Sequence, residues 1–376
     1  MTRYIEKAAV YGRITDEALE SLKRRIGAEI IDPEPFLRQI TKDAIRHFAY
    51  GIGDDNPLWV DEDYAKKSKH DTLLAPPCIL YTCDRTVSGY VWGLPSVHAM
   101  YSGTKWEWFK PIRVGDTITA KSRLKDLVEK KGQFAGRTIN QIYETVFTDA
   151  KGELLAKADS WCIRTEREKA QTLGKYATIT QHAYTEEELN KIWRGYEREE
   201  RRGANPRYWE NVEIGEELPL VVKGPLRVTD IIAFLMGWGG LYVKAHKLAF
   251  RQFKQHPALA IPNSLNVPEP PEHVHWDSDF ARKVGVPAAY DYGPQRICWI
   301  SHVLTNWMGD DGFLRKLEVQ VRRFNIVGDV TWCKGRVTRK FKEDNDHLVE
   351  CEVWAENQRN EVTARGTASV LLPTKK

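Results

Sequence analysis

The stretch ITKDAIRHFAYGIGDDNPLWVDEDYAKK, residues 40–67, sets the pattern on which the rest of this chain is built. Thr41, followed by an acidic residue and then an apolar run, is typical of the start of a helix. The second half repeats the stretch in two pieces, RVTDIIAFLMGWGG at 227–240 and DSDFARK at 277–283. The repeat indicates two related halves, and the second half carries an insertion at 241–270 between the two pieces.

Each half continues into long segments of alternating polar and apolar residues, which are typical of β-strands. A Val-Gly-Asp turn precedes the first such strand of each half, at Gly115–Asp116 and at Gly328–Asp329. The helix at 231–238 has few charges and must be buried on most sides. We therefore expect an α+β fold, with a curved antiparallel sheet wrapped round one such helix in each half.

The repeat and its junction predict the domain organisation. We expect an N-terminal domain at 1–170, a linker with an exposed helix at 171–206, and a C-terminal domain at 207–376 that contains the inserted loop 241–270. We predict the helix in the linker from the spacing of its charged residues, which is typical of a solvated helix.

Composition excludes several classes of protein. The 376 residues include 56 Lys and Arg against 52 Asp and Glu, a net charge of +4 that does not suit binding to nucleic acid by bulk charge. No apolar run approaches the ~20 residues of a membrane-spanning helix, and the charged N-terminus has no signal-peptide core. None of the six cysteines forms a CxxC pair. We expect a cytoplasmic protein with buried free thiols that binds neither nucleic acid nor membrane.

The segment FAYGIGDDNPLWVDEDYA, residues 48–65, resembles the signature of the MaoC-like dehydratases, also called (R)-specific enoyl-CoA hydratases. The two-half layout resembles the double hot-dog members with an N-terminal FAS1-like dehydratase half, in which each sheet rolls round a central helix. This resemblance implies a hydro-lyase that adds or removes water at a trans-2-enoyl-CoA or 3-hydroxyacyl-CoA thioester. It further implies a homodimer or larger homo-oligomer that needs no cofactor, coenzyme A being part of the substrate.

The family's catalytic pair is an Asp and a His five residues later, which hold one water between them as general base and acid. The first half keeps Asp54, but Trp59 stands in the place of the histidine. The second half keeps His275, but Gly240 stands in the place of the aspartate. The resemblance therefore favours a working site in the second half, with His275 at its centre and a carboxylate supplied from elsewhere.

The residues leave the source of that carboxylate open. Glu269 and Glu272 precede the histidine, Asp277 follows it, and Asp54 would have to reach it across the two halves. Asp277 could instead cap the helix that begins there. Asp54 could likewise act in a turn with Asn56, and His275 itself could be a structural histidine.

Further site residues are implied for substrate binding. They are Asn56 in the first half and Tyr292, Gly293 and Arg296 in the second. Gly293 could let a backbone N–H approach the thioester carbonyl, and Arg296 could pair with Asp291 or with a CoA phosphate. The HxH pair at 273–275 lacks a visible third ligand, so we expect no metal. Two other functions stay open: a non-catalytic acyl-CoA-binding or scaffold subunit of a hydratase complex, and a hot-dog thioesterase.

Overall fold

The computed structural model describes residues 12–95, 97–132, 136–166 and 179–375. The strands are β1 (Glu29–Ile30), β2 (His98–Trp108), β3 (Thr119–Gly132), β4 (Gly136–Thr148), β5 (Leu154–Thr165), β6 (Val221–Lys223), β7 (Ile261–Pro262), β8 (Pro268–Glu269), β9 (Phe313–Val321), β10 (Thr331–Glu343), β11 (Asp346–Asn357) and β12 (Val362–Leu371). The α-helices are α1 (Asp16–Lys23), α2 (Lys42–Ile52), α3 (Pro57–Val60), α4 (Glu62–Lys67), α6 (Glu186–Glu197), α7 (Val228–Trp238), α8 (His246–Gln255), α9 (Ser278–Lys283) and α10 (Gly293–Met308). Short 3₁₀ helices are η1 (Pro77–Thr82), η2 (Trp209–Asn211), η3 (Pro257–Leu259) and η4 (Pro271–His275).

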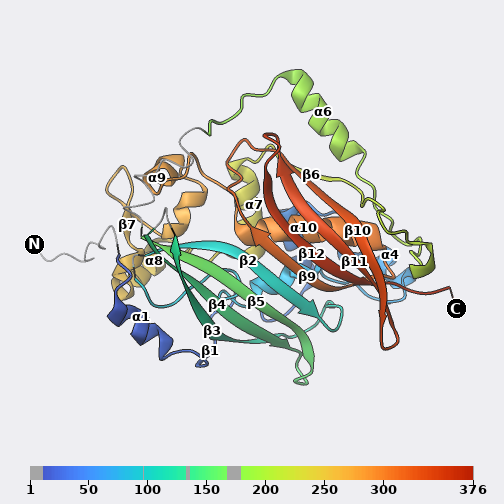
Figure 1. Cartoon of the computed structure of the whole chain (residues 1–376), viewed down its shortest axis with the longest axis horizontal. Coiled ribbons are helices and arrows are strands. Elements are labelled where there is room, and N and C mark those ends of the chain that lie inside the picture. The colour runs from blue at the N-terminus through green and yellow to red at the C-terminus, as the bar shows by residue number, and fades with distance from the viewer. Residues whose placement is uncertain (1–11, 96, 133–135, 167–178, 376) are drawn as a thin grey trace, which may run out of the picture.

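The two halves share one antiparallel sheet. Its ten strands run in the order β1-β3-β4-β5-β2-β9-β12-β11-β10-β6, so β2 of the first half pairs with β9 of the second (Figure 1). The register at this junction runs from Gly103 opposite Gln320 to Glu107 opposite Lys316. The α+β, double hot-dog fold class is confirmed, with the two predicted sheets joined edge to edge.

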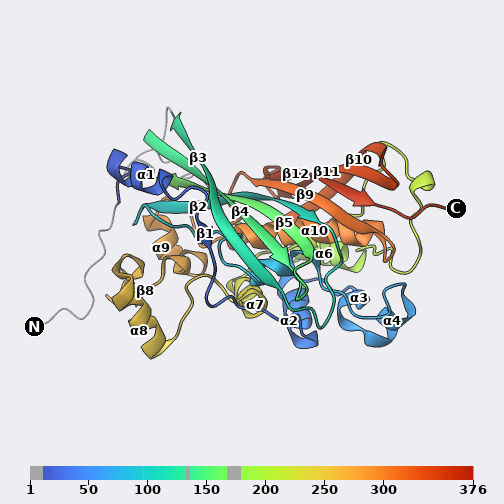
Figure 2. The same ribbon diagram turned by 90° about the horizontal axis from the view of Figure 1, so that it is seen from below.

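The helix inside the curved sheet of the second half is α10. All its residues from Pro294 to Met308 are buried, and Figure 2 shows α10 against the sheet with α2 and α7 beyond it. The prediction that the helix at 231–238 fills this place is wrong, because α7 exposes 49% of Ile232 and 67% of Met236. In the first half the short helix η1 is buried from Cys78 to Thr82. It follows α2, α3 and α4 along the chain, as α10 follows α7 and α9 in the second half.

The predicted repeat appears in the packing of α2 on α7. A Cβ added to Gly51 would lie 2.8 Å from the carbonyl oxygen of Ala233, and one added to Gly237 would lie 2.5 Å from that of His47. The two equivalent glycines therefore let the two equivalent helices approach backbone to backbone. Thr41 caps α2 as predicted, because its side chain accepts a hydrogen bond from the Ala44 N–H.

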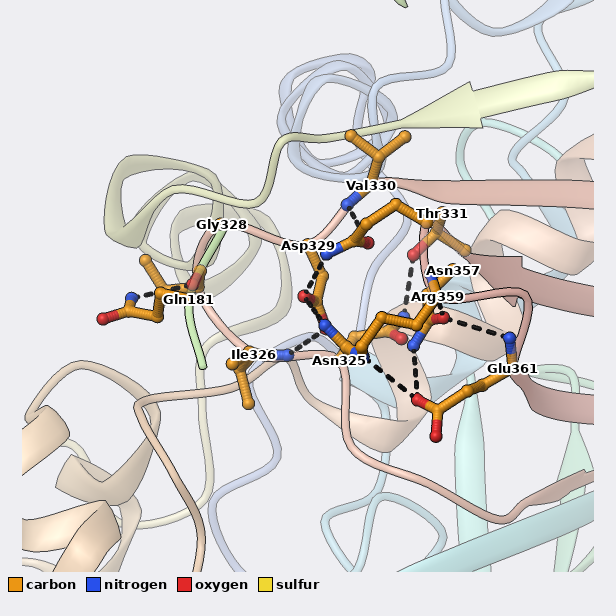
Figure 3. A network of polar contacts seen from close by, with 12 residues as sticks. Gln181, Asn325, Ile326, Gly328, Asp329, Val330, Thr331, Asn357, Arg359 and Glu361 are labelled. Atoms are coloured by element: carbon orange, nitrogen blue, oxygen red, sulfur yellow. Dashed lines mark hydrogen bonds and ion pairs between the residues drawn. The ribbon is translucent and has the colours of Figure 1, made fainter. Parts of the chain in front are cut away.

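The two Val-Gly-Asp turns also share their local chemistry. The Asp116 carboxylate accepts from the Arg113 N–H at 2.8 Å, and the Asp329 carboxylate accepts from the Ile326 N–H at 3.0 Å. In the second half the buried Asp329 also faces the guanidinium of Arg359, with contacts of 2.6 and 2.7 Å (Figure 3). Each aspartate thereby fixes the entry into a long strand, β3 or β10.

The insertion at 241–270 is more ordered than the expected loop, since it contains α8, η3 and the small β7–β8 pair. The linker contains the expected helix, α6, whose outer face is exposed. All six cysteines are free and buried, as predicted. The described residues contain no helix with the length and apolarity that a membrane crossing requires.

Candidate active site

A cavity of about 1450 Å³ opens between the two halves beside the insertion. The first half contributes part of segment 85–102 to its wall, and the insertion contributes α8 and the residues around it. The second half contributes η4, the N-terminal end of α10 and the segment 321–324 after β9. The cavity therefore meets the start of the buried helix α10, where backbone N–H groups lack helical partners.

His275 lines this cavity at the end of η4. Its Nδ1 lies 2.8 Å from the carbonyl oxygen of Tyr290. A carbonyl only accepts, so Nδ1 carries the proton and the lone pair on Nε2 can act as a base. The imidazole packs against the ring of Tyr292 with a centroid distance of 3.7 Å, and burial lowers the pKa of His275 to about 4. The imidazole is therefore neutral at pH 7.

Glu272 lies in the same short helix and also lines the cavity, although only 4% of it is exposed. Its carboxylate accepts hydrogen bonds from the N–H groups of Leu241 at 3.0 Å and Tyr242 at 2.7 Å. The Tyr292 hydroxyl donates a third, at 2.9 Å. Burial raises the pKa of Glu272, and these hydrogen bonds oppose the rise.

The position of this carboxylate explains the glycine that stands in place of the family's aspartate. A Cβ added to Gly240 would lie 3.1 Å from Oε1 of Glu272. In the first half, Asp54 accepts from the N–H of Asn56, two residues on, at 3.0 Å. Glu272 accepts from the N–H of Tyr242, which is likewise two residues beyond Gly240. The Glu272 carboxylate thus fills the space next to Gly240 and takes the hydrogen bond that the aspartate takes in the first half.

Glu272 and His275 are joined through a tyrosine rather than directly. Among the described residues, no carboxylate oxygen lies within 4.0 Å of a ring nitrogen of His275. Tyr292 bridges the two, since its ring packs on His275 and its hydroxyl donates to Glu272. Glu272, His275 and Tyr292 all line the cavity.

Asp54 belongs to a different, closed cluster, so the prediction that it could meet His275 across the halves is wrong. Its Oδ2 accepts from the indole N–H of Trp59 at 3.0 Å, and its Oδ1 lies 3.4 Å from Nε2 of His302 on α10. Glu199 and Lys223 complete the cluster, at 3.1 and 3.0 Å from the ring nitrogens of His302. None of these side chains lines the cavity. Buried charges and the indole fill the first-half counterpart of the site.

Two further predicted site residues act as helix caps. Asp277 caps α9 by accepting from the Phe280 N–H at 2.9 Å, as Asp61 caps α4 in the first half. Asn56 caps α3 by accepting from the Leu58 N–H at 3.0 Å. Neither lines the cavity, so the structure places both outside the candidate site.

The other predicted residues do line the cavity. Tyr292, Gly293 and Arg296 all contribute to its wall. Arg296 is held by the buried Asp291, with its Nε 2.8 Å from Oδ2, and is therefore committed to an ion pair. A Cβ added to Gly293 would lie 2.3 Å from the ring of Tyr101, which explains the glycine by close packing.

Sequence reasoning missed Tyr242 and His302. Tyr242 carries the N–H that holds Glu272, and His302 holds Asp54 in the closed cluster. The register of the repeat could have found Tyr242, because it matches Asn56. His302 had no comparable signal, since a lone histidine in a buried helix has no motif around it.

Comparisons with known proteins agree with this architecture. The family model described as the FAS1-like dehydratase domain region matches residues 24–158. A UPF0336 protein of Parafrankia sp. (strain EAN1pec) is 30% identical over 137 residues, which cover 35% of this chain and 86% of that protein.

Two solved structures resemble the whole chain. A MaoC-like dehydratase matches with a TM-score of 0.65 and 16% identity, covering 94% of this chain and 100% of that one. A protein of Mycobacterium tuberculosis described as having a double hot-dog fold matches with a TM-score of 0.53 and 10% identity, covering 98% and 96%. The chain therefore belongs, through its first half, to the family of the UPF0336 proteins with a FAS1-like dehydratase region, and its whole fold is the double hot-dog fold that the MaoC-like dehydratase structure shares.

Proposed function

We propose that this protein hydrates trans-2-enoyl-CoA thioesters, or dehydrates the corresponding 3-hydroxyacyl-CoA, in the cavity beside His275. The observation that carries the proposal is the position of Glu272. Its carboxylate stands where the family's aspartate is missing, three residues before the family's histidine and on the same cavity wall. A base and an acid on one wall are what addition of water to a conjugated thioester requires.

The geometry suggests which residue acts as the base, which one orients the water and which group faces the enolate oxygen. The neutral imidazole of His275 takes a proton from water at Nε2 while the water oxygen bonds to C3 of the enoyl group. Glu272 holds and orients the same water, directly or through the Tyr292 hydroxyl. The resulting enolate takes a proton at C2 from this acid–base pair, so that one water is consumed. The N-terminal end of α10, at Gly293, offers its N–H and the positive end of the helix dipole to the enolate oxygen.

The proposal is tested with the purified chain and a series of trans-2-enoyl-CoA esters, from crotonyl-CoA to bulkier acyl groups. Loss of the conjugated thioester absorbance without release of free thiol is the expected result. Release of thiol would instead identify a thioesterase. Binding of the esters without turnover would identify a non-catalytic acyl-CoA-binding or scaffold subunit.

A matched pair of variants tests the assignment of the base. His275→Gln should lower kcat by about 10²–10⁴-fold, because it removes the proton acceptor. His273→Gln is the control, since His273 belongs to the same short helix but stacks on Phe280 and does not line the cavity. Circular dichroism should show both variants folded. Turnover by His275→Gln at the rate of the unmodified protein would refute the site.

A further inference from the structure

The insertion has an unusual charge distribution. From residue 241 to residue 268 it contains no Asp or Glu, but it contains Lys244, Lys247, Arg251 and Lys254. Three of these basic residues lie on α8, spaced four and three residues apart, so they share one side of the helix. An acid-free segment in a chain with 52 acidic residues is a strongly positive local surface.

These basic side chains are available to a ligand. Lys247, Arg251 and Lys254 are exposed, and none of them has a hydrogen bond or ion pair with any described residue. Other basic residues nearby are paired: Lys244 lies 3.3 Å from Glu34, and Arg282 pairs with Asp279. The charge of the three α8 side chains is therefore not neutralised within the described part of the chain.

This basic side of α8 borders the cavity. Arg251 lies in the cavity wall, next to Leu248, Gln252 and Gln255 of the same helix. Arg322, after β9, lies in the same wall and hydrogen-bonds to Gln320 rather than to an acid. Over the whole lining, eight Lys and Arg stand against four Asp and Glu.

A polar atom in the wall adds a second, independent indication of a ligand. Oε1 of Gln252 is buried and has no hydrogen-bond partner among the described residues. This atom has almost no accessible surface in the structure, so a bound molecule with N–H groups would satisfy it only after the Gln252 amide turns toward the ligand, which would relieve the cost of the unpaired acceptor. Exposed basic side chains on α8 and an amide side chain beside Arg251 in the wall match a ligand that carries both phosphates and amides.

We propose that α8 is the phosphate-binding element of this protein, with Lys247, Arg251 and Lys254 binding the 3′-phosphate and diphosphate of coenzyme A. The pantetheine arm then enters past Gln252, and its thioester end reaches the His275 side of the cavity. This inference rests on the proposed function for the identity of the thioester, but the binding of phosphates does not depend on turnover. Coenzyme A is preferred to an acidic carrier protein because Arg251 and Gln252 belong to the cavity wall and not only to the outer surface.

Calorimetric titration of the full chain tests this inference with three probes: coenzyme A, adenosine 3′,5′-bisphosphate and pantetheine. The triple variant Lys247→Ala/Arg251→Ala/Lys254→Ala should bind coenzyme A and the bisphosphate about tenfold more weakly, and pantetheine unchanged. Lys191→Ala is the control, because Lys191 is an exposed lysine on α6 that does not line the cavity. Alanine suits a helix surface, so the thermal midpoint should not change.

The outcomes separate this inference from the proposed function. Equal affinity of the triple variant and the unmodified chain for the bisphosphate would overturn the inference. Loss of binding to an acyl carrier protein, with binding to coenzyme A intact, would also overturn it. With N-acetylcysteamine thioesters, which have no phosphates, the triple variant and the unmodified chain should convert the substrate at equal rates. If neither turns over any thioester, the proposed function fails while the titration result stands on its own.

Discussion

Replacing Glu272 by glutamine separates the charge of this side chain from its shape. The carboxylate receives donors from Leu241, Tyr242 and Tyr292. A glutamine oxygen in the place of Oε2 keeps both backbone donors, since Oε2 lies 3.1 and 2.7 Å from them. The new NH₂ group then faces the Tyr292 hydroxyl, which can turn to accept. The hydrogen bonds survive, and only the ionisable group is lost.

The expected effect on stability follows from the pKa. Burial raises the pKa of Glu272 in the folded protein, so the folded state holds this proton more tightly than the unfolded chain does. The unmodified protein therefore loses stability as the pH rises from the unfolded pKa to the folded one. Glu272→Gln has no such loss, and its free energy of unfolding at pH 8 should equal or exceed that of the unmodified protein. Glu272→Ala, in contrast, leaves three buried donors unpaired at about 1–3 kcal/mol each.

Glu272→Gln should lower the rate of catalysis, although it should not lower the stability of the protein. Loss of a positioned acid–base group should lower kcat by about 10²–10⁴-fold, equivalent to about 3–5 kcal/mol in the activation free energy. The assay is hydration of an enoyl-CoA at pH 8, with urea unfolding of the same samples at pH 5 and pH 8. A variant that is inactive and at least as stable as the parent supports the assignment. A Glu272→Gln protein within about threefold of the parental rate would refute it.

Two further predictions concern the fold around the site. The pKa of His275 is about 4 in the folded protein against 6.5 for a free histidine, so protonation opposes folding. This residue should cost the protein up to about 3 kcal/mol as the pH falls from 6.5 to 4, and His275→Gln should remove that loss when urea unfolding is compared at pH 7 and pH 4. A Cβ added to Gly237 would lie 2.5 Å from the His47 carbonyl oxygen and 2.7 Å from the Phe48 Cα, so α2 and α7 must separate. Gly237→Ala should destabilise the protein by at least about 2 kcal/mol, and an unchanged thermal midpoint would contradict this account of the crossing.

Much of the local structure could be read from the sequence because local hydrogen bonds specify it. Thr41 caps its helix, and the carboxylates of Asp116 and Asp329 hold their turns, each through an N–H within three residues. The long strands alternate as the two faces of a sheet require. The equivalence of Gly51 and Gly237 was also visible, although its purpose, a close crossing of two helices, is seen only in three dimensions.

The central helix could not be chosen from hydrophobicity. The segment 231–238 is more apolar than 293–308, yet α10 is the buried one. Polar residues of α10 find partners from distant segments: His302 meets Asp54 and Glu199. Such pairing of buried polar groups depends on long-range contacts that no local pattern encodes.

The sequence by itself indicated a duplicated chain that resembles the double hot-dog proteins, with the aspartate and the histidine of the resembled signature in different halves. Only the tertiary structure decided which carboxylate stands beside Gly240. Glu272 lies 32 residues away from that glycine, across a folded insertion whose path brings the carboxylate back to the N–H groups of Leu241 and Tyr242. The reason is physical: hydrogen bonds between near neighbours follow from residue type and spacing, whereas contacts across an insertion depend on how the whole chain packs.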